Sequence, residues 1–198
     1  LHADIHGAPS CSLRATQGFI IDEHRPAHIP DYIPAFRLVD KLGDERINDK
    51  KLLEAATLSL CWSRAWASGG GHGTVYCVKP AQVSKTAQTG EYVGKGAFII
   101  RGKRQWFKDL DVKMGLGLVS INGVPLLMSG TPDRIKSICQ RYAIISPGIS
   151  KKDKLANRIY KNTGLMTDDI LSVLPGSSEI IEDRGIFSKI KEKIVEEE

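Results

Sequence analysis

The sequence predicts an α+β fold, with a mixed and mostly antiparallel β-sheet packed by one long buried helix. Three observations predict this fold. Short strand-like segments broken by glycine and proline recur up to residue 128, one strongly apolar helical segment spans about 49–68, and short helices alternate with a strand afterwards. We therefore expect a first domain over 1–128 and a small α/β C-terminal appendage over 131–198.

The first segments predict short strands followed by an excursion on the surface. Residues 2–6 and 10–15 alternate between apolar and polar side chains, as short strands do. Residues 25–46 carry three prolines at intervals of four residues. Because proline interrupts both helices and central strands, we expect 25–46 to form an insertion loop that contains neither.

The clearest helix of the chain is expected from about Asp49 to Ser68. Asn48 or Asp49 caps its start, and the three glycines after Ser68 end it. Apolar residues cover more than half of its circumference, so it is expected to be largely buried. Trp62 and Trp66 are four residues apart and would share one face, which favours core packing and leaves a base-stacking pair as the alternative.

The segments after this helix predict the rest of the sheet. They are, in order, a strand over 74–78, a polar loop over 82–92, a strand over 97–101, a basic turn over 102–107 and a hairpin over 112–128. The hairpin prediction depends on Asn122-Gly123, a residue pair that type I′ turns favour.

The appendage is expected to consist of short helices around one strand. Its predicted elements are a helix over 132–139, a strand over 141–145, a turn at Pro147-Gly148, a helix over 151–162 ended by Gly164, a short helix from Thr167 to before Pro175, and an amphipathic helix over 186–198. Ser150 and Asp153 resemble a capping box for the helix over 151–162.

Positive charge is concentrated in one part of the chain. Between Lys79 and Lys113 there are eight cations and three anions, which accounts for the whole net charge of +5. Such a local excess is typical of a surface that meets polyanions, and a solvated lysine-rich face is the alternative.

The composition also bears on the compartment. The four cysteines show no C-x-x-C spacing, which favours free buried thiols in a reducing environment. No apolar run approaches the roughly 18 residues that cross a bilayer, so we expect a cytoplasmic protein with no membrane partner. The sequence opens at Leu1 directly in strand-like residues, so we expect a piece of a longer protein.

Three residues near the start form a candidate ligand-binding group. His2, Asp4 and His6 would project from one face of a strand. Two imidazoles and a carboxylate suit zinc or a similar ion, which would make the chain a metal-dependent hydrolase. The alternatives are a hydrogen-bonded polar patch and a contact with RNA phosphate or ribose. No serine-hydrolase elbow or dinucleotide fingerprint occurs, so an enzyme is not expected.

The polar loop over 82–92 is a candidate phosphate site. It offers one ammonium group and three hydroxyls, from Lys85, Ser84, Thr86 and Thr89. It lacks the glycine pattern of a nucleotide-binding P-loop, so a nucleoside triphosphatase is not predicted. An ordinary turn-rich connection is the alternative.

The basic turn is a candidate RNA contact. Arg101, Lys103 and Arg104 come just before two aromatic residues, Trp106 and Phe107. Cations beside aromatic rings can hold an RNA backbone and stack an exposed base. In the alternative, both aromatic rings close the core beneath a solvated basic turn.

Three ordered motifs carry a family resemblance. They are His-Ala-Asp-Ile-His-Gly-Ala at 2–8, the helical segment 53–66 with Glu-Ala-Ala and Ser-Arg-Ala-Trp, and the long polar and basic stretch 82–104. Together they resemble the RNA-binding NFACT-R domain of the NFACT family of ribosome quality-control factors. Pro147-Gly148 followed by Lys151-Lys152 is similar to a pattern of archaeal and eukaryotic members, which favours an archaeal source.

The resemblance implies an RNA-binding module that acts on stalled nascent-chain complexes. Its expected partners are large-subunit ribosomal RNA, tRNA and nascent-chain quality-control proteins, and no cofactor is expected. The cations Lys85, Arg101, Lys103 and Arg104 would bind phosphates. A protein-interaction module, formed by the apolar helix and the appendage, is the remaining alternative.

Overall fold

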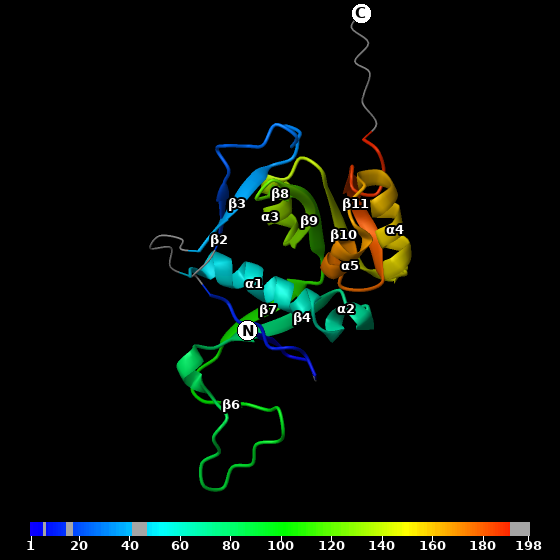
Figure 1. The fold of residues 1–198 in the computed structure, drawn as a ribbon. Coiled ribbons are helices and arrows are strands. Elements are labelled where there is room, and N and C mark those ends of the chain that lie inside the picture. Colours follow the sequence, from blue (N-terminus) through cyan, green and yellow to red (C-terminus); the bar gives the residue numbers. More distant parts are fainter. Residues whose placement is uncertain (6, 15–17, 41–46, 191–198) are drawn as a thin grey trace, which may run out of the picture.

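The computed structural model describes residues 1–5, 7–14, 18–40 and 47–190, and it has the expected α+β architecture (Figure 1). Its helices are α1 (Asp49–Cys61), α2 (Arg64–Ser68), α3 (Pro132–Ile138), α4 (Lys152–Thr163) and α5 (Thr167–Val173), with a 3₁₀ turn at Pro80–Gln82. Its strands are β1 (His2–Ala3), β2 (Gly18–Ile21), β3 (Ala35–Val39), β4 (His72–Cys77), β5 (Val83–Ser84), β6 (Ile99–Ile100), β7 (Gln105–Asp111), β8 (Met114–Ile121), β9 (Val124–Gly130), β10 (Tyr142–Ser150) and β11 (Ser178–Arg184).

The described strands form a small and a large sheet, plus one two-stranded pair. The small sheet has the order β1-β4-β7 and is antiparallel throughout. The large sheet has the order β11-β10-β8-β3-β2, with β9 also paired to β8, and its parallel pair is β3 with β8. Strands β5 and β6 pair with each other at the base of a loop that projects away from the body (Figure 1).

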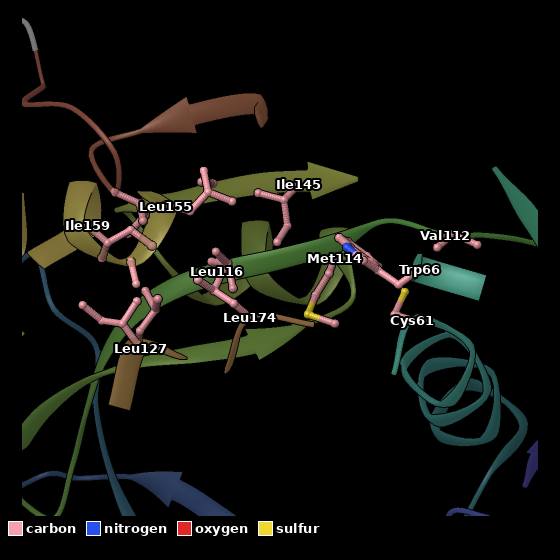
Figure 2. Close-up of a cluster of buried hydrophobic side chains, with 14 of the residues drawn as sticks. Cys61, Trp66, Val112, Met114, Leu116, Leu127, Ile145, Leu155, Ile159 and Leu174 are labelled. Carbon is pink, nitrogen blue, oxygen red and sulfur yellow. The ribbon is translucent and has the colours of Figure 1, made fainter. Parts of the chain in front are cut away.

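One hydrophobic core joins the two sheets. It continues from α1 and α2 across β8 and β10 to α4 and α5. Figure 2 shows Met114, Leu116 and Ile145 between the helix residue Cys61 on one side and Leu155 on the other. Strand β8 belongs to the expected first domain and β10 to the expected appendage, and the two strands pair with each other. The division into 1–128 and 131–198 therefore stays a prediction about which parts fold independently.

The expectation of one long buried helix over Asp49–Ser68 was wrong. The helix breaks at Trp62 and Ser63, because the Ser63 hydroxyl accepts a hydrogen bond from the Ala65 N–H and so caps a new helix, α2. The start was predicted well: the Asn48 side chain accepts from the Lys51 N–H at 2.9 Å.

The break also separates the two tryptophans of this region. Trp62 is exposed, whereas Trp66 is buried and its Nε1 donates to the Ser177 carbonyl at 2.9 Å. The two rings therefore do not form a shared base-stacking face, and only Trp66 packs in the core.

The proline segment is more structured than its sequence predicts. Ile29 and Ile33 are buried in the main core, and β3 follows immediately after the last proline, Pro34. The prediction that 25–46 holds no central strand was therefore wrong, since β3 lies between β8 and β2 in the large sheet. Proline excludes a strand only over the residues that it interrupts, and 35–39 contains none. Residues 41–46 lie outside the described part of the chain.

Most elements with strong local signals are confirmed. The strand over 74–78 overlaps β4 at residues 74–77, and the hairpin of β8 and β9 turns at Asn122 and Gly123, with φ of 49° and 78°. Helices α3, α4 and α5 lie where they were expected, and Gly164 ends α4 in the left-handed conformation.

Several predictions in the second half were wrong. Gln105–Asp111 is a strand, so Trp106 and Phe107 do not belong to a basic turn. Strand β10 continues through Pro147-Gly148, and α4 has no side-chain cap from a capping box. Strand β11 was not predicted. The expected last helix is absent from 186–190, and its remainder lies outside the described residues.

Candidate nucleic-acid interface

The small sheet has one covered and one uncovered face. Helix α1 packs against all three of its strands. The register pairs Ala3 with Val75 and Val75 with Phe107, and these three side chains pack in or against the main core. Successive residues of a strand point to opposite faces, so their neighbours His2, Tyr76 and Trp106 point away from α1. The uncovered face therefore carries a row of three rings.

These rings form a cross-strand ladder. The register places His2 opposite Tyr76 and Tyr76 opposite Trp106. The ring centroids of His2 and Tyr76 are 5.6 Å apart, and those of Tyr76 and Trp106 are 5.3 Å apart in an edge-to-face arrangement. Trp106 at the end of the row is 42% exposed. Tyr76 is only 9% exposed and His2 is half-buried, so Trp106 provides the accessible ring of the row.

Arg104 lies over this ladder. Its guanidinium carbon is 4.7 Å from the Tyr76 ring centroid and 5.9 Å from that of Trp106. Such cation–π contacts hold a guanidinium in place while its N–H groups stay available. Arg104 directly precedes β7 and Lys108 lies within it, two residues to either side of Trp106, and both cations are exposed. The ring contact with Tyr76 assigns Arg104 to the uncovered face, and the alternation of side chains from Trp106 assigns Lys108 to it.

An open hollow lies beside the ladder. Its volume is about 310 Å³, and its lining residues are His2, Ala3, Asp4, Ile5, Gly7, Tyr76 and Arg104. Among the described residues, the buried Nδ1 atom of His2 has no hydrogen-bond partner. Buried polar atoms are almost always paired, so this atom is an exception among the buried polar groups. Two of the predicted site residues, His2 and Asp4, thus line one hollow, whereas His6 lies outside the described residues.

The loop between β5 and β6 is organised by one ion pair. Arg101 Nη2 lies 2.6 Å from Glu91 Oε2, which also accepts the Gln88 N–H at 2.8 Å. The Gln88 hydrogen bond and the Arg101 guanidinium lower the pKa of the Glu91 carboxyl. Arg101 therefore already has an anionic partner.

The hydroxyl residues of this loop are largely solvent-facing. The Ser84 hydroxyl accepts the Thr86 N–H at 3.0 Å and closes a tight turn, while Thr86 and Thr89 are exposed. Lys85 lies over the Phe98 ring, with Nζ 5.4 Å from its centroid, and stays exposed. The loop thus presents Lys85 and the hydroxyls of Thr86 and Thr89, with Ser84 shaping the turn.

The loop and the ladder are joined through Gln82. Its Nε2 donates to the carbonyls of Arg101 and Lys103, both at 2.9 Å. This clamp holds the turn at Gly102, whose φ is +82°. Lys103 is consequently displayed between the loop and Arg104, at the start of the uncovered face.

Sequence reasoning missed three residues of this surface. Tyr76 and Lys108 could have been found from the alternation of side chains along their strands. Arg64 could not have been found from its sequence neighbours, because only the fold brings it close to Gly7. A Cβ placed on Gly7 would lie 3.3 Å from the Arg64 guanidinium carbon. Arg64 thus adds a cation beside the hollow.

Within the described part of the chain, no group of three or more His, Cys, Asp or Glu side chains could hold a metal ion. The hypothesis of a site formed by His2, Asp4 and His6 includes a residue outside that part, so it stays untested. None of the described helices is long and apolar enough to span a membrane.

Comparison with known proteins identifies the family. The family model described as the NFACT protein RNA binding domain matches residues 1–102, which include β1, α1, β4 and the loop up to Gly102. The chain belongs to the NFACT family. The matched region contains the hollow's first strand and ends just before Arg104, and the resemblance seen in the sequence is thereby confirmed.

Curated relatives of this NFACT chain carry names from ribosome quality control. The archaeal Rqc2 homolog aRqcH of Methanocaldococcus jannaschii is 33% identical over 184 residues, which are 91% of this chain and 23% of that protein. The ribosome quality control complex subunit NEMF of Homo sapiens is 33% identical over 119 residues, 60% of this chain and 9% of the relative. The Drosophila melanogaster homolog is 43% identical over 75 residues, 38% and 8% of the two chains. No solved structure matches the chain significantly.

Proposed function

We propose that this chain is the RNA-contacting module of a ribosome-associated quality-control factor and that it binds large-subunit ribosomal RNA or tRNA on stalled nascent-chain complexes. The observation that carries the proposal is the uncovered face of the small sheet, where Arg104, Trp106 and Lys108 lie side by side in a chain of an RNA-binding family. The names of the relatives, an archaeal Rqc2 homolog and a ribosome quality control complex subunit, support this proposal. The module spans less than a quarter of these relatives, so we assign it contact with RNA and no catalytic step.

The proposed phosphate ligands are four cations of the loop and the uncovered face that have no anionic partner among the described residues. They are Lys85, Lys103, Arg104 and Lys108, and the hydroxyls of Thr86 and Thr89 add donors beside Lys85. Arg101 has a different role in this proposal: it holds the loop through Glu91 and places Lys85. We locate the module in the cytoplasm, where ribosomes translate.

Charge removal tests the proposal. The Lys103→Ala/Arg104→Ala variant should weaken binding to purified large ribosomal subunits and flatten the salt dependence of the binding constant. Each lost phosphate contact reduces the slope of log K against log salt by roughly 0.7 to 0.9, so two contacts reduce it by roughly 1.5. Arg101→Ala should reduce the slope less, because its charge is already balanced by Glu91.

The matched control removes a cation elsewhere. Lys136 pairs with Glu182 on the large sheet, so Lys136→Ala changes the net charge without touching the proposed surface. Equal slopes for this control and the double variant would overturn the proposal. Binding that ignores salt altogether would also overturn it and would favour the alternative of a protein-interaction module.

A further inference from the structure

We propose that the hollow beside the aromatic ladder receives one unpaired RNA nucleotide, with its base stacked on Arg104 and the next base stacked on Trp106. This inference rests on the proposed function and goes beyond it, because phosphate contacts alone would not distinguish paired from unpaired RNA. Three features of the site support it: a fixed stacking plane, a polar wall that faces the edge of a base, and an orientation that a duplex cannot use.

Arg104 provides the stacking plane. One face of its guanidinium rests on Tyr76 at 4.7 Å, and Arg104 as a residue is exposed. RNA-binding proteins stack unpaired bases on guanidinium planes as well as on aromatic rings. Because Tyr76 already fixes the plane, a base can stack on its other face, and the N–H groups at its rim can reach the phosphate of the same nucleotide.

The opposite wall of the hollow is suited to the edge of a base. His2, whose buried Nδ1 has no hydrogen-bond partner among the described residues, lines the hollow, and so does the exposed Asp4 with its carboxylate. A carboxylate only accepts hydrogen bonds, so it favours a base with an exocyclic amino group over one with a carbonyl at the same position. Cytosine and uracil differ in this way at C4, and the site should therefore prefer cytosine.

Only an unpaired strand can use these features together. In an A-form duplex the base faces are stacked on each other and the Watson–Crick edges are paired, so neither Arg104 nor Asp4 could reach them. The exposed end of the ladder, Trp106, lies one strand further along the same face and is available to a neighbouring base. Base–aromatic stacking of this kind tolerates any base, so the preference arises at the hollow.

Fluorescence anisotropy with short labelled RNAs tests the inference. The probes are oligocytidylate, oligouridylate and an RNA duplex with the same number of phosphates. The unmodified chain should bind oligocytidylate more tightly than oligouridylate, and both more tightly than the duplex. Trp106→Ala should weaken single-strand binding by about five-fold or more while leaving the salt slope unchanged, because it removes a stacking surface and no charge.

Matched variants separate stacking from general damage. Trp62→Ala removes a tryptophan of similar exposure, 38% against 42%, from the end of α1 and should leave RNA binding unchanged. Trp106→Phe should restore most of the affinity that Trp106→Ala loses. Asp4→Asn should abolish the preference for oligocytidylate without weakening duplex binding.

The outcomes also separate this inference from the proposed function. Suppose that the salt slope of RNA binding depends on Lys103 and Arg104, but that substitution of Trp106 or Asp4 changes neither affinity nor base preference. The nucleotide site is then wrong and the RNA-contact function stands. If none of the RNAs and no ribosomal subunit binds, both fail. Equal losses for Trp106→Ala and Trp62→Ala would likewise refute the site.

Discussion

Helix α3 lies so close to β8 that Gly117 cannot be replaced without a clash. A Cβ at Gly117 would meet the Cys139 sulfur, and it would lie 3.1 Å from the Cys139 Cβ and 3.2 Å from Ile135 Cγ2. Cys139 and Ile135 are both buried, so neither can swing into solvent. Overpacking of a core site costs about 1 to 3 kcal/mol, and we expect Gly117→Ala to destabilise the fold by that amount.

A second substitution makes this prediction specific to the contact. Cys139→Ala alone removes one buried heavy atom and should cost about 1 kcal/mol. In the double variant the sulfur can no longer clash with the new methyl group, whereas the 3.1 Å and 3.2 Å approaches remain. The double variant should therefore lose about 1 kcal/mol less free energy of unfolding than the sum of the losses of the two single variants. Such a coupling is typical of residues in contact.

Urea unfolding of the four proteins gives the free energies of unfolding for this cycle. Gly71→Ala is the matched control, because a Cβ there meets nothing within 4 Å, and it should change stability by less than about 1 kcal/mol. Additive effects of Gly117→Ala and Cys139→Ala, within about 0.5 kcal/mol, would refute the close approach of α3 to β8.

Burial raises the pKa of the Cys61 and Cys139 thiols to about 12, so neither should react with a disulfide reagent at about pH 8 until urea unfolds the protein. Reaction of all four cysteines in the native state would contradict this. Hydrogen bonds from Lys136 and Tyr142 lower the pKa of the Glu182 carboxyl. The stability that it contributes is present above the unfolded pKa of about 4.3 and is lost as the pH falls through the lower folded value. In the Glu182→Gln variant, Tm should not show this loss as the pH falls. If Tm of the variant and of the unmodified protein fell in the same way at acid pH, the pairing of Glu182 would be contradicted.

The elements that the sequence predicted well are those specified by residues next to each other. The Asn122-Gly123 pair defines its turn through two positive φ angles, and Gly164 ends α4 in the same conformation. These signals act within a few residues and need no knowledge of the rest of the chain. The α+β class followed from them, because it requires only the kinds of element and their order.

The elements that were missed depend on hydrogen bonds between distant residues. Strand β3 is short and follows a proline-rich segment, and β8 and β2 stabilise it from either side. Strand β11 likewise depends on its pairing with β10. The break between α1 and α2 is different: Ser63 carried a local signal for it, but the apolar residues on both sides masked that signal.

The candidate site shows the same division between local and distant information. In a turn, Trp106 and Phe107 were expected to have the same role: both would stack on RNA, or both would close the core. In a strand, adjacent residues face opposite sides, so Phe107 packs toward α1 while Trp106 stays on the uncovered face. Arg104 directly precedes this strand and contacts the ladder, whereas Arg101 pairs with Glu91 of the loop. The cations that looked equivalent in the sequence therefore have different surroundings, and the surface that we propose for RNA is defined by strand register rather than by the density of positive charge.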